Sequence, residues 1–294
     1  MKSSFQTIGL IGKFNDNSVQ RMLTRIISHL HEKGCTVLLD DNSAALVEAL
    51  PQGVVVASRE QIGETCDLAV VVAGDGTLLN VARSLVDYGV PLLGVNLGRL
   101  GFLVDVCPEQ IEPLLDEILG GRYDAEDRIL LQARIVRDGE TISESTAFND
   151  VVVHKWEAAR MIEIETSVGG QFLNRSRSDG LIVSTPTGST AYALSGGGPI
   201  LHPALETIVL VPICPHTMSL RPLVLSAASE LEIVVNRENN ESAQVTCDGQ
   251  VSLALQPGDR ILVNRLARKI RLLHPQGHDY FDILRNKLHW GKRL

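Results

Sequence analysis

The first third of the chain alternates short apolar runs with stretches in which apolar residues recur at helical spacing. Apolar runs occupy residues 8–12, 36–40, 68–72 and 91–95. Between the first two runs, apolar residues recur every three or four positions from Val19 to Leu30, as in an amphipathic helix. The continuous run Leu-Ala-Val-Val-Val at 68–72 suits a strand covered by helices on both faces of a parallel sheet. This pattern predicts a doubly wound α/β domain.

After a predicted helix over residues 108–119, the pattern changes to short β-rich runs broken by Gly, Asn and Asp, which favours a mainly antiparallel, all-β domain. The amphipathic tail from Tyr280 to Leu288 predicts one closing helix whose packing partner the sequence does not identify. We expect an α/β domain over residues 1–124, a β-rich domain over 125–278 and a closing helix over 279–294, with the active site in the cleft between the domains. The predicted strands of the β-rich domain are 130–136, 150–154, 161–168, 180–184, 207–212, 231–236, 245–247, 260–264 and 270–274.

The composition narrows the range of partners. The net charge of −8 gives no global attraction for nucleic acid or anionic lipid, so an anionic ligand needs a local site. No stretch reads as a signal peptide or is apolar enough to cross a bilayer. The five scattered cysteines lack metal-type spacing and fit a reducing compartment. We therefore expect a cytoplasmic protein with no nucleic acid or membrane partner.

A glycine-flanked aspartate follows the apolar run at 68–72. Gly74-Asp75-Gly76 leads directly into a stretch with helical apolar spacing. Ligands bind where parallel strands end, and a helix N-terminus offers amide donors to an anion. Glycines on both sides let a phosphate approach the backbone while a carboxylate projects into the same space. The segment suits phosphoryl transfer; the alternative is a turn in which Asp75 is only the helix N-cap.

A second segment, residues 184–195, is dense in hydroxyls and glycines and follows a predicted strand. It can present several neutral donors to phosphate or sugar oxygens without a lysine. A flexible surface loop has the same composition, so this alternative stays open.

The sequence lacks the P-loop, the Gly-x-Gly-x-x-Gly dinucleotide fingerprint and the Gly-x-Ser-x-Gly elbow. Four histidines have no partner at triad or zinc spacing, so we expect core or surface roles for His154, His202, His216 and His274.

The two candidate segments resemble those of the NAD kinase family, whose members convert NAD to NADP at the expense of ATP. The family's Gly-Gly-Asp-Gly-Thr signature resembles residues 73–77, although Ala73 replaces the first glycine, which matters if that position needs a positive φ. Its longest motif is similar to Ser-Thr-Pro-Thr-Gly-Ser-Thr-Ala-Tyr at 184–192. Other similar segments follow in the family's order over nearly the whole chain: residues 96–103, Asn149-Asp150, Asp179-Gly180, residues 197–200, Pro215-His216, Arg221-Pro222 and Asp248-Gly249-Gln250.

The resemblance implies transfer of the ATP γ-phosphoryl group to the 2′-hydroxyl of the adenosine ribose of NAD. It implies that Asp75 is the base, that Mg²⁺ or another divalent cation is carried with ATP, and that the chain forms a homo-oligomer, a dimer or a tetramer. No metal-ligating residue is predicted. Tyr192 either stacks on a base or is a buried tyrosine with a bonded hydroxyl. The resemblance assigns NAD and nucleotide binding to Asp75, Gly76, Asn149, Asp150, Arg160, Arg177, Asp179, Thr190, Ala191, Tyr192, Ala193, Leu194, Ser195 and Gln250.

Two rival functions remain. A lipid kinase of the diacylglycerol type shares Gly-Asp-Gly-Thr, but a membrane-facing basic or apolar run is missing from this acidic chain. A non-catalytic NAD(P) sensor would use the same pocket without transfer, and the presence of Asp75 argues against it.

Overall fold

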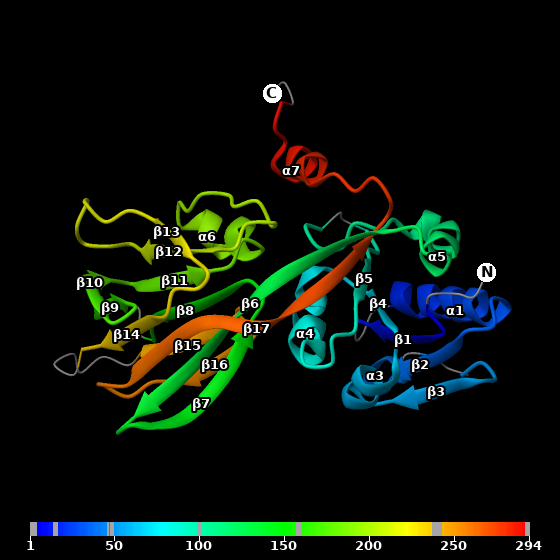
Figure 1. The fold of residues 1–294 in the computed structure, drawn as a ribbon, viewed down its shortest axis with the longest axis horizontal. Helices are drawn as coiled ribbons and strands as arrows, with labels where there is room; N and C mark the ends of the chain where they lie inside the picture. The colour runs from blue at the N-terminus through cyan, green and yellow to red at the C-terminus, as the bar shows by residue number, and fades with distance from the viewer. Residues whose placement is uncertain are drawn as a thin grey trace. The chain divides into compact units, whose positions relative to one another are not determined.

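The computed structural model describes residues 5–13, 17–45, 47, 50–98, 101–156, 160–236 and 243–291. The chain divides into two compact units, the first formed by Met1–Asp127 with Ile270–Leu294 and the second by Arg128–Lys269 (Figure 1). Residues 270–278, which we assigned to the β-rich domain, therefore group with the first unit. The physical reason is that the end of the long strand β17 (Arg260–His274) joins the parallel sheet, where Leu272 and Leu273 pair with Leu92 and Leu93.

The first unit contains one parallel sheet with strand order β17-β5-β4-β1-β2-β3. Its order reverses between β4 and β1, which is where ligands bind in doubly wound folds, at the carboxyl ends of the strands. The apolar runs at 8–12, 36–40, 68–72 and 91–95 form strands as predicted. Besides β17, the strands of this sheet are β1 (Thr7–Gly12), β2 (Thr36–Asp40), β3 (Val54–Ala57), β4 (Leu68–Val72) and β5 (Leu92–Val95).

Two helices of the first unit, α1 and α5, bury their apolar stripes against this sheet. Leu23 and Ile27 of α1 share a core with Leu115 and Ile118 of α5 and with alternate strand residues. The predicted helix at 108–119 begins as a short 3₁₀ turn, Pro108–Gln110. The helices are α1 (Asn17–Glu32), α2 (Asp41–Ala44), α3 (Arg59–Thr65), α4 (Asp75–Leu85), α5 (Ile111–Leu119) and α7 (Tyr280–Leu288).

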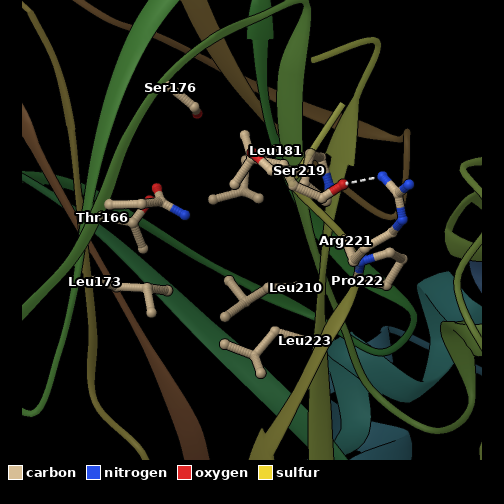
Figure 2. A pocket seen from close by; sticks show the side chains of 12 residues that line it. Thr166, Leu173, Ser176, Leu181, Leu210, Ser219, Arg221, Pro222 and Leu223 are labelled. Carbon is tan, nitrogen blue, oxygen red and sulfur yellow. Dashed lines mark hydrogen bonds between the residues drawn. The ribbon is translucent and has the colours of Figure 1, made fainter. Parts of the chain in front are cut away.

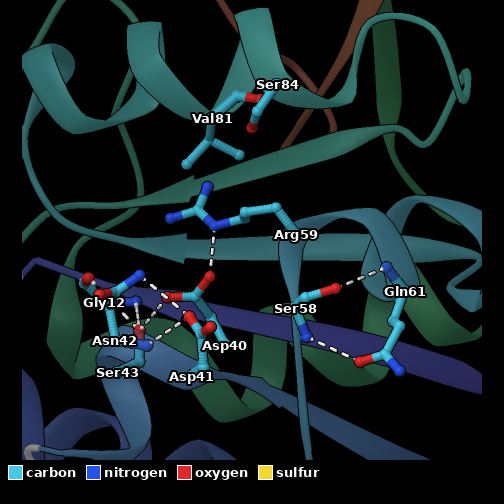
Figure 3. Close-up of polar contacts among 10 residues, drawn as sticks. All are labelled: Gly12, Asp40, Asp41, Asn42, Ser43, Ser58, Arg59, Gln61, Val81 and Ser84. Carbon is cyan, nitrogen blue, oxygen red and sulfur yellow. Dashed lines mark hydrogen bonds and ion pairs between the residues drawn. The ribbon is translucent and has the colours of Figure 1, made fainter.

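A buried polar cluster closes the carboxyl ends of β1 and β2 (Figure 3). Asp40 is fully buried, pairs with the Arg59 side chain and accepts a hydrogen bond from Ser43 Oγ at 3.1 Å. The same hydroxyl accepts the amide of Gly12 at 2.8 Å. Because a buried carboxylate needs a charged partner, this cluster ties β2 to the start of α3. None of the predicted site residues belongs to it.

The second unit contains antiparallel sheets, as predicted. One has the order β13-β12-β11-β8-β15-β16, and the other joins β10, β9, β14 and β17 to the hairpin of β6 and β7. Val151 and Val153 of β8 point into the core that the two sheets enclose, while Val152 belongs to a second core with Ala193 and Leu201. Besides β17, the strands of these sheets are β6 (Asp124–Arg137), β7 (Glu140–Ala147), β8 (Asp150–Lys155), β9 (Ile162–Val168), β10 (Gln171–Ser178), β11 (Gly180–Ser184), β12 (Thr207–Ile213), β13 (Leu223–Ser226), β14 (Leu231–Val235), β15 (Ala243–Cys247) and β16 (Val251–Ala254).

The structure corrects two points of the strand prediction. The predicted strands at 260–264 and 270–274 are one strand, β17, because the polar residues between them are partly exposed and hide the apolar pattern. Strands β3, β7, β10, β13 and β16 were not predicted. Among the described residues, none of the helices is long and apolar enough to span a membrane.

Candidate active site

Asp75 lies at the start of α4, immediately after β4. Gly74 is the N-cap, with φ −95°, and it has no side-chain cap bond. Asp75 is therefore the first helical residue and not the N-cap. Ala73 is buried and does not have a positive φ, and its amide donates to Val95 O at 3.0 Å. The alanine at the family's glycine position is thus compatible with the backbone.

The Asp75 carboxylate accepts three successive backbone amides from the loop after β5. Oδ2 accepts Phe102 N at 2.9 Å, and Oδ1 accepts Leu103 N at 3.1 Å and Val104 N at 3.2 Å. A Cβ at Gly101 would overlap Oδ1, so only glycine allows this approach. These bonds fix the orientation of a half-buried carboxylate at a helix N-terminus. Arg99 and Leu100, inside the segment 96–103, lie outside the described residues.

A pocket of about 420 Å³ lies within the second unit and is of ordinary ligand-binding size. Its lining includes four residues that we predicted for NAD binding, Asn149, Asp150, Ala191 and Tyr192. Tyr192 is 47% exposed, so it is not the buried tyrosine of the alternative interpretation, and its ring is accessible for stacking. The residues that the prediction did not assign are Val152, His154, Gln244, Thr246, Asp248 and Gly249.

Asp248 organises this pocket in the way that the loop amides organise Asp75. Its carboxylate accepts the amides of Phe148 at 3.0 Å, Asn149 at 2.7 Å and Asp150 at 3.2 Å. Asp248 itself has φ +53°, which a non-glycine residue rarely adopts. The sequence places Asp248 in a family-like motif but does not predict this role, because its three partners are about a hundred positions away in sequence.

Asp150 is 4% exposed at the wall of the pocket. Burial raises the pKa of its carboxyl group to about 7, and the nearby charge of Asp248 acts in the same direction. Near neutral pH a large share of Asp150 is thus protonated, and it can donate a hydrogen bond to a ligand as well as accept one.

From the sequence we expected the hydroxyls of residues 184–195 to donate hydrogen bonds to a ligand, but several of them have partners inside the protein. Ser184, Thr185 and Ser189 are buried and donate to backbone carbonyls, with Thr185 Oγ1 to Phe148 O at 2.7 Å and Ser189 Oγ to Pro186 O at 2.6 Å. These hydroxyls hold the segment in a 3₁₀ turn, Gly188–Thr190, and a short helix, α6 (Tyr192–Ser195). They are therefore used inside the protein, and the segment is not a flexible surface loop.

The other predicted contacts lie outside the lining of this pocket. Ala193 is fully buried in a core, whereas Ser195 and Gln250 are exposed. Asp179 pairs with Lys155 at 2.7 Å. Arg160 and Arg177 are exposed, Thr190 and Leu194 are half-buried, and Gly76 is exposed in the first unit.

The fold and these two sites define a class of protein. A parallel α/β unit with an oriented carboxylate at a helix N-terminus, joined to a β unit with a polar pocket, is typical of a nucleotide-binding phosphotransferase. Two family domains match the chain: the ATP-NAD kinase N-terminal domain at residues 8–123 and the ATP-NAD kinase C-terminal domain at residues 148–274. The chain therefore belongs to the NAD kinase family, and it is an enzyme that phosphorylates NAD with ATP.

Relatives and solved structures agree with this family. The NAD kinase of Nitrosococcus oceani is 50% identical over 100% of both chains, and that of Chromohalobacter salexigens is 48% identical over 99% of this chain and 98% of the other. Yeast NADH kinase complexed with NADH aligns at TM-score 0.88 with 25% identity, covering 99% of this chain and 92% of that one. An NAD kinase from Archaeoglobus fulgidus in complex with ATP aligns at TM-score 0.73 with 26% identity, covering 97% and 99%.

Proposed function

We propose that Asp75 is the general base that activates the 2′-hydroxyl of the adenosine ribose of NAD. The hydroxyl proton moves to the carboxylate, the ribose oxygen bonds to the γ-phosphorus of ATP, and the bond to the β,γ-bridging oxygen breaks to release ADP and NADP. The observation that carries this proposal is the orientation of Asp75 by three successive amides.

The count of hydrogen bonds selects the oxygen atom that takes the proton. A carboxylate has about four lone-pair sites, two on each oxygen. Oδ1 accepts two amides and Oδ2 accepts one, so the remaining site is on Oδ2. We assign the proton transfer to Asp75 Oδ2.

We propose that Asn149 and Asp150 hold the adenine and ribose of NAD and that Tyr192 stacks on a base. All three line the pocket of the second unit, and Asp150 can donate or accept a hydrogen bond near neutral pH. Further proposed contacts, assigned by family position, are Gly76, Arg160, Arg177, Asp179, Thr190, Ala191, Ala193, Leu194, Ser195 and Gln250.

We propose that Mg²⁺ is carried by the phosphates of ATP and that no protein cage holds it. Mg²⁺ takes oxygen ligands, and Asp75 has one remaining lone-pair site, which the proton transfer needs. When bound, the ion offsets phosphate charge during transfer.

We also propose a cytoplasmic location and a homo-oligomer. The five cysteines all lie in the described part of the chain, where none of them forms a disulfide, and this is compatible with a reducing compartment. Self-association is supported by apolar side chains exposed at the edge strand β13, Leu223 and Val224.

The assay for this function mixes purified protein with ATP, Mg²⁺ and NAD and detects NADP with an NADP-specific dehydrogenase. The wild type should form NADP. Asp75→Asn keeps the size of the side chain but removes the base, so kcat should fall about 10²- to 10⁴-fold while the Kd for NAD changes less than about threefold. Asp87→Asn, an exposed aspartate of the same unit, is the matched control and should be fully active.

Two results would contradict the proposal. Full activity of Asp75→Asn would remove Asp75 as the base. Binding of NAD without any NADP from the wild type would make the chain a sensor.

A further inference from the structure

A carboxylate and two stacked imidazoles form a cluster in the first unit, outside the site described above. Asp105 Oδ2 accepts His274 Nδ1 at 3.0 Å and His278 Nδ1 at 2.8 Å. The two rings stack with centroids 3.8 Å apart and planes 21° from parallel. The side chains of His274 and Asp105 are 2% and 9% exposed. This network therefore joins the end of β17 and the turn after it to the loop that follows β5.

The Asp105 carboxylate interacts strongly with the two imidazoles. Burial alone would raise the pKa of Asp105, but hydrogen bonds and charge from His274 and His278 outweigh burial and hold that pKa at about 2. Glu126 Oε2 lies 3.6 Å from His274 Nε2, and Asp124 accepts the amides of Gly277 at 2.7 Å and His278 at 3.2 Å. Asp105 and Asp124 thus hold the turn that carries His278, while Glu126 faces the end of β17.

The geometry favours a hydrogen-bonded network over a metal site. A single Asp105 oxygen accepts both Nδ1 atoms, and the two rings lie nearly parallel. Lone pairs in the planes of parallel rings run side by side and do not converge on one ion, as tetrahedral coordination would need.

Asp105 directly follows the residues that orient Asp75. The amide of Val104 donates to Asp75 Oδ1 at 3.2 Å, and the Val104 side chain is fully buried, where a Cβ on Gly94 would collide with it. One residue beyond Asp105, Val106 pairs with Val95 at the end of β5. Asp105 therefore lies on the same short stretch of backbone as the amides that hold the Asp75 carboxylate.

The C-terminal helix reaches the same loop at a second point. Lys287 Nζ of α7 lies 5.6 Å from the ring centroid of Phe102, whose amide donates to Asp75 Oδ2. Tyr280, Ile283 and Leu284 of α7 are buried, and the helix groups with the first unit. The segment from His274 to Lys287 thus contacts the loop at both ends of the run of amides.

We propose that the C-terminal segment 274–287 positions the catalytic carboxylate, with Asp105 and Lys287 as positioning residues that act through the backbone amides of residues 102–104. The inference rests on the proposed role of Asp75 as base. The effect is indirect, because each residue holds the loop that aims Asp75 Oδ2.

The test combines hydrogen exchange with steady-state kinetics on the full chain. Asp105→Asn keeps the side-chain size but loses the charge that holds both imidazoles, so the amides of residues 102–104 should exchange at least tenfold faster. The kcat for NADP formation should fall at least tenfold, while the KM for NAD stays within threefold. Asp127→Asn is the matched control, because Asp127 is an exposed aspartate that pairs with Arg271 of β17, the strand that carries His274. It should leave exchange and kcat unchanged.

Lys287→Met keeps the test valid if Asp105→Asn fails to fold. It retains an unbranched side chain and removes the charge over Phe102, so kcat should fall about two- to fivefold, with faster exchange at residue 102. Arg285→Met on the same helix, which breaks ion pairs with Asp279 and Asp282, should have no effect.

Three results would overturn the inference: wild-type protection of residues 102–104 in Asp105→Asn, faster exchange there without loss of kcat, or a uniform rise in exchange across the first unit. The exchange measurement needs no substrate. If the wild type makes no NADP, the proposed function fails, while protection of the loop still reports whether the segment holds it.

Discussion

At the scale of single residues, both sites use one device, a carboxylate that accepts three successive backbone amides. Asp75 does this for residues 102–104, and Asp248 does it for residues 148–150. Amides in an irregular loop need partners, and an ionised acceptor makes stronger hydrogen bonds than a neutral one. The consequences differ: at Asp75 the carboxylate is itself the proposed reacting group, whereas Asp248 holds the backbone of Asn149 and Asp150.

Burial and, secondarily, the nearby charge of Asp248 make the protonation of Asp150 sensitive to pH. The pKa of Asp150 is about 7 in the folded chain against an ordinary value of 3.8, so between about pH 4 and pH 7 the folded state holds a proton that the unfolded state has released. Stability must then fall as pH rises through this window, by about 4 kcal/mol at most. Asp150→Asn removes the effect, and its Tm relative to wild type should rise by several degrees from pH 5 to pH 8.

Thermal melts of both proteins across that range measure this difference. Asp87→Asn, an exposed aspartate, supplies the control, since its offset from wild type should stay constant. A constant offset for Asp150→Asn as well would mean that Asp150 is ionised throughout.

At the scale of elements, the segment 184–195 shows that a composition typical of a ligand-binding loop can stabilise the fold instead. Ser189 Oγ donates to Pro186 O at 2.6 Å and accepts Leu201 N at 2.9 Å, so this hydroxyl joins two parts of the chain. Ser189→Ala leaves the buried Leu201 amide without this partner and should destabilise the protein by about 1–3 kcal/mol. The KM for NAD should change less than about twofold.

Melting curves and steady-state kinetics of Ser189→Ala and of a control variant, Ser195→Ala, distinguish a structural role of the Ser189 hydroxyl from a contact with substrate. Ser195→Ala, at an exposed position of α6, should leave Tm unchanged. If Ser189→Ala instead kept its Tm and raised the KM, the hydroxyl would be a substrate contact.

The elements that the sequence predicted correctly are those whose buried residues form a regular or continuous apolar pattern. Every residue of β4 is buried, and its continuous apolar run predicted a strand in a parallel sheet. By contrast, β7 and β10 are mostly exposed hairpin strands with few apolar residues, so their pairing with β6 and β9 leaves little trace in hydropathy. Exposed edges of a sheet are held by backbone bonds, which side-chain patterns do not report.

At the scale of the whole molecule, the candidate site residues belong to short motifs, whereas the contacts that orient them are long-range in sequence. Gly74-Asp75-Gly76 and Asn149-Asp150 were found from local sequence and from family resemblance. The partners that orient them, the amides of residues 102–104 and the carboxylate of Asp248, are separated from them by 27 or more positions. The Asp105 cluster joins residues 169 positions apart, and His274 was therefore predicted to be only a core or surface histidine.

An apolar surface on the second unit bears on the assembly of the protein. A pocket of about 310 Å³ is lined by leucines such as Leu173, Leu210 and Leu223 and by polar residues such as Thr166 and Arg221, and it contains none of the predicted site residues (Figure 2). Beside it, the edge strand β13 exposes Leu223 and Val224 and pairs with β12. Because exposed apolar edges invite pairing with another chain, we expect copies of this protein to associate there.

Sedimentation analysis of Val224→Glu tests this assembly. Val224 is 42% exposed, so a charge should be tolerated by the fold but should prevent an apolar interface from forming, and the sedimenting mass should drop below that of the wild type. Leu50→Glu is the matched control in the first unit, where an apolar side chain outside any strand is 43% exposed, and it should keep the wild-type mass. An unchanged mass for Val224→Glu would place any self-association on another face, because a buried glutamate in the interface would cost several kcal/mol in each copy.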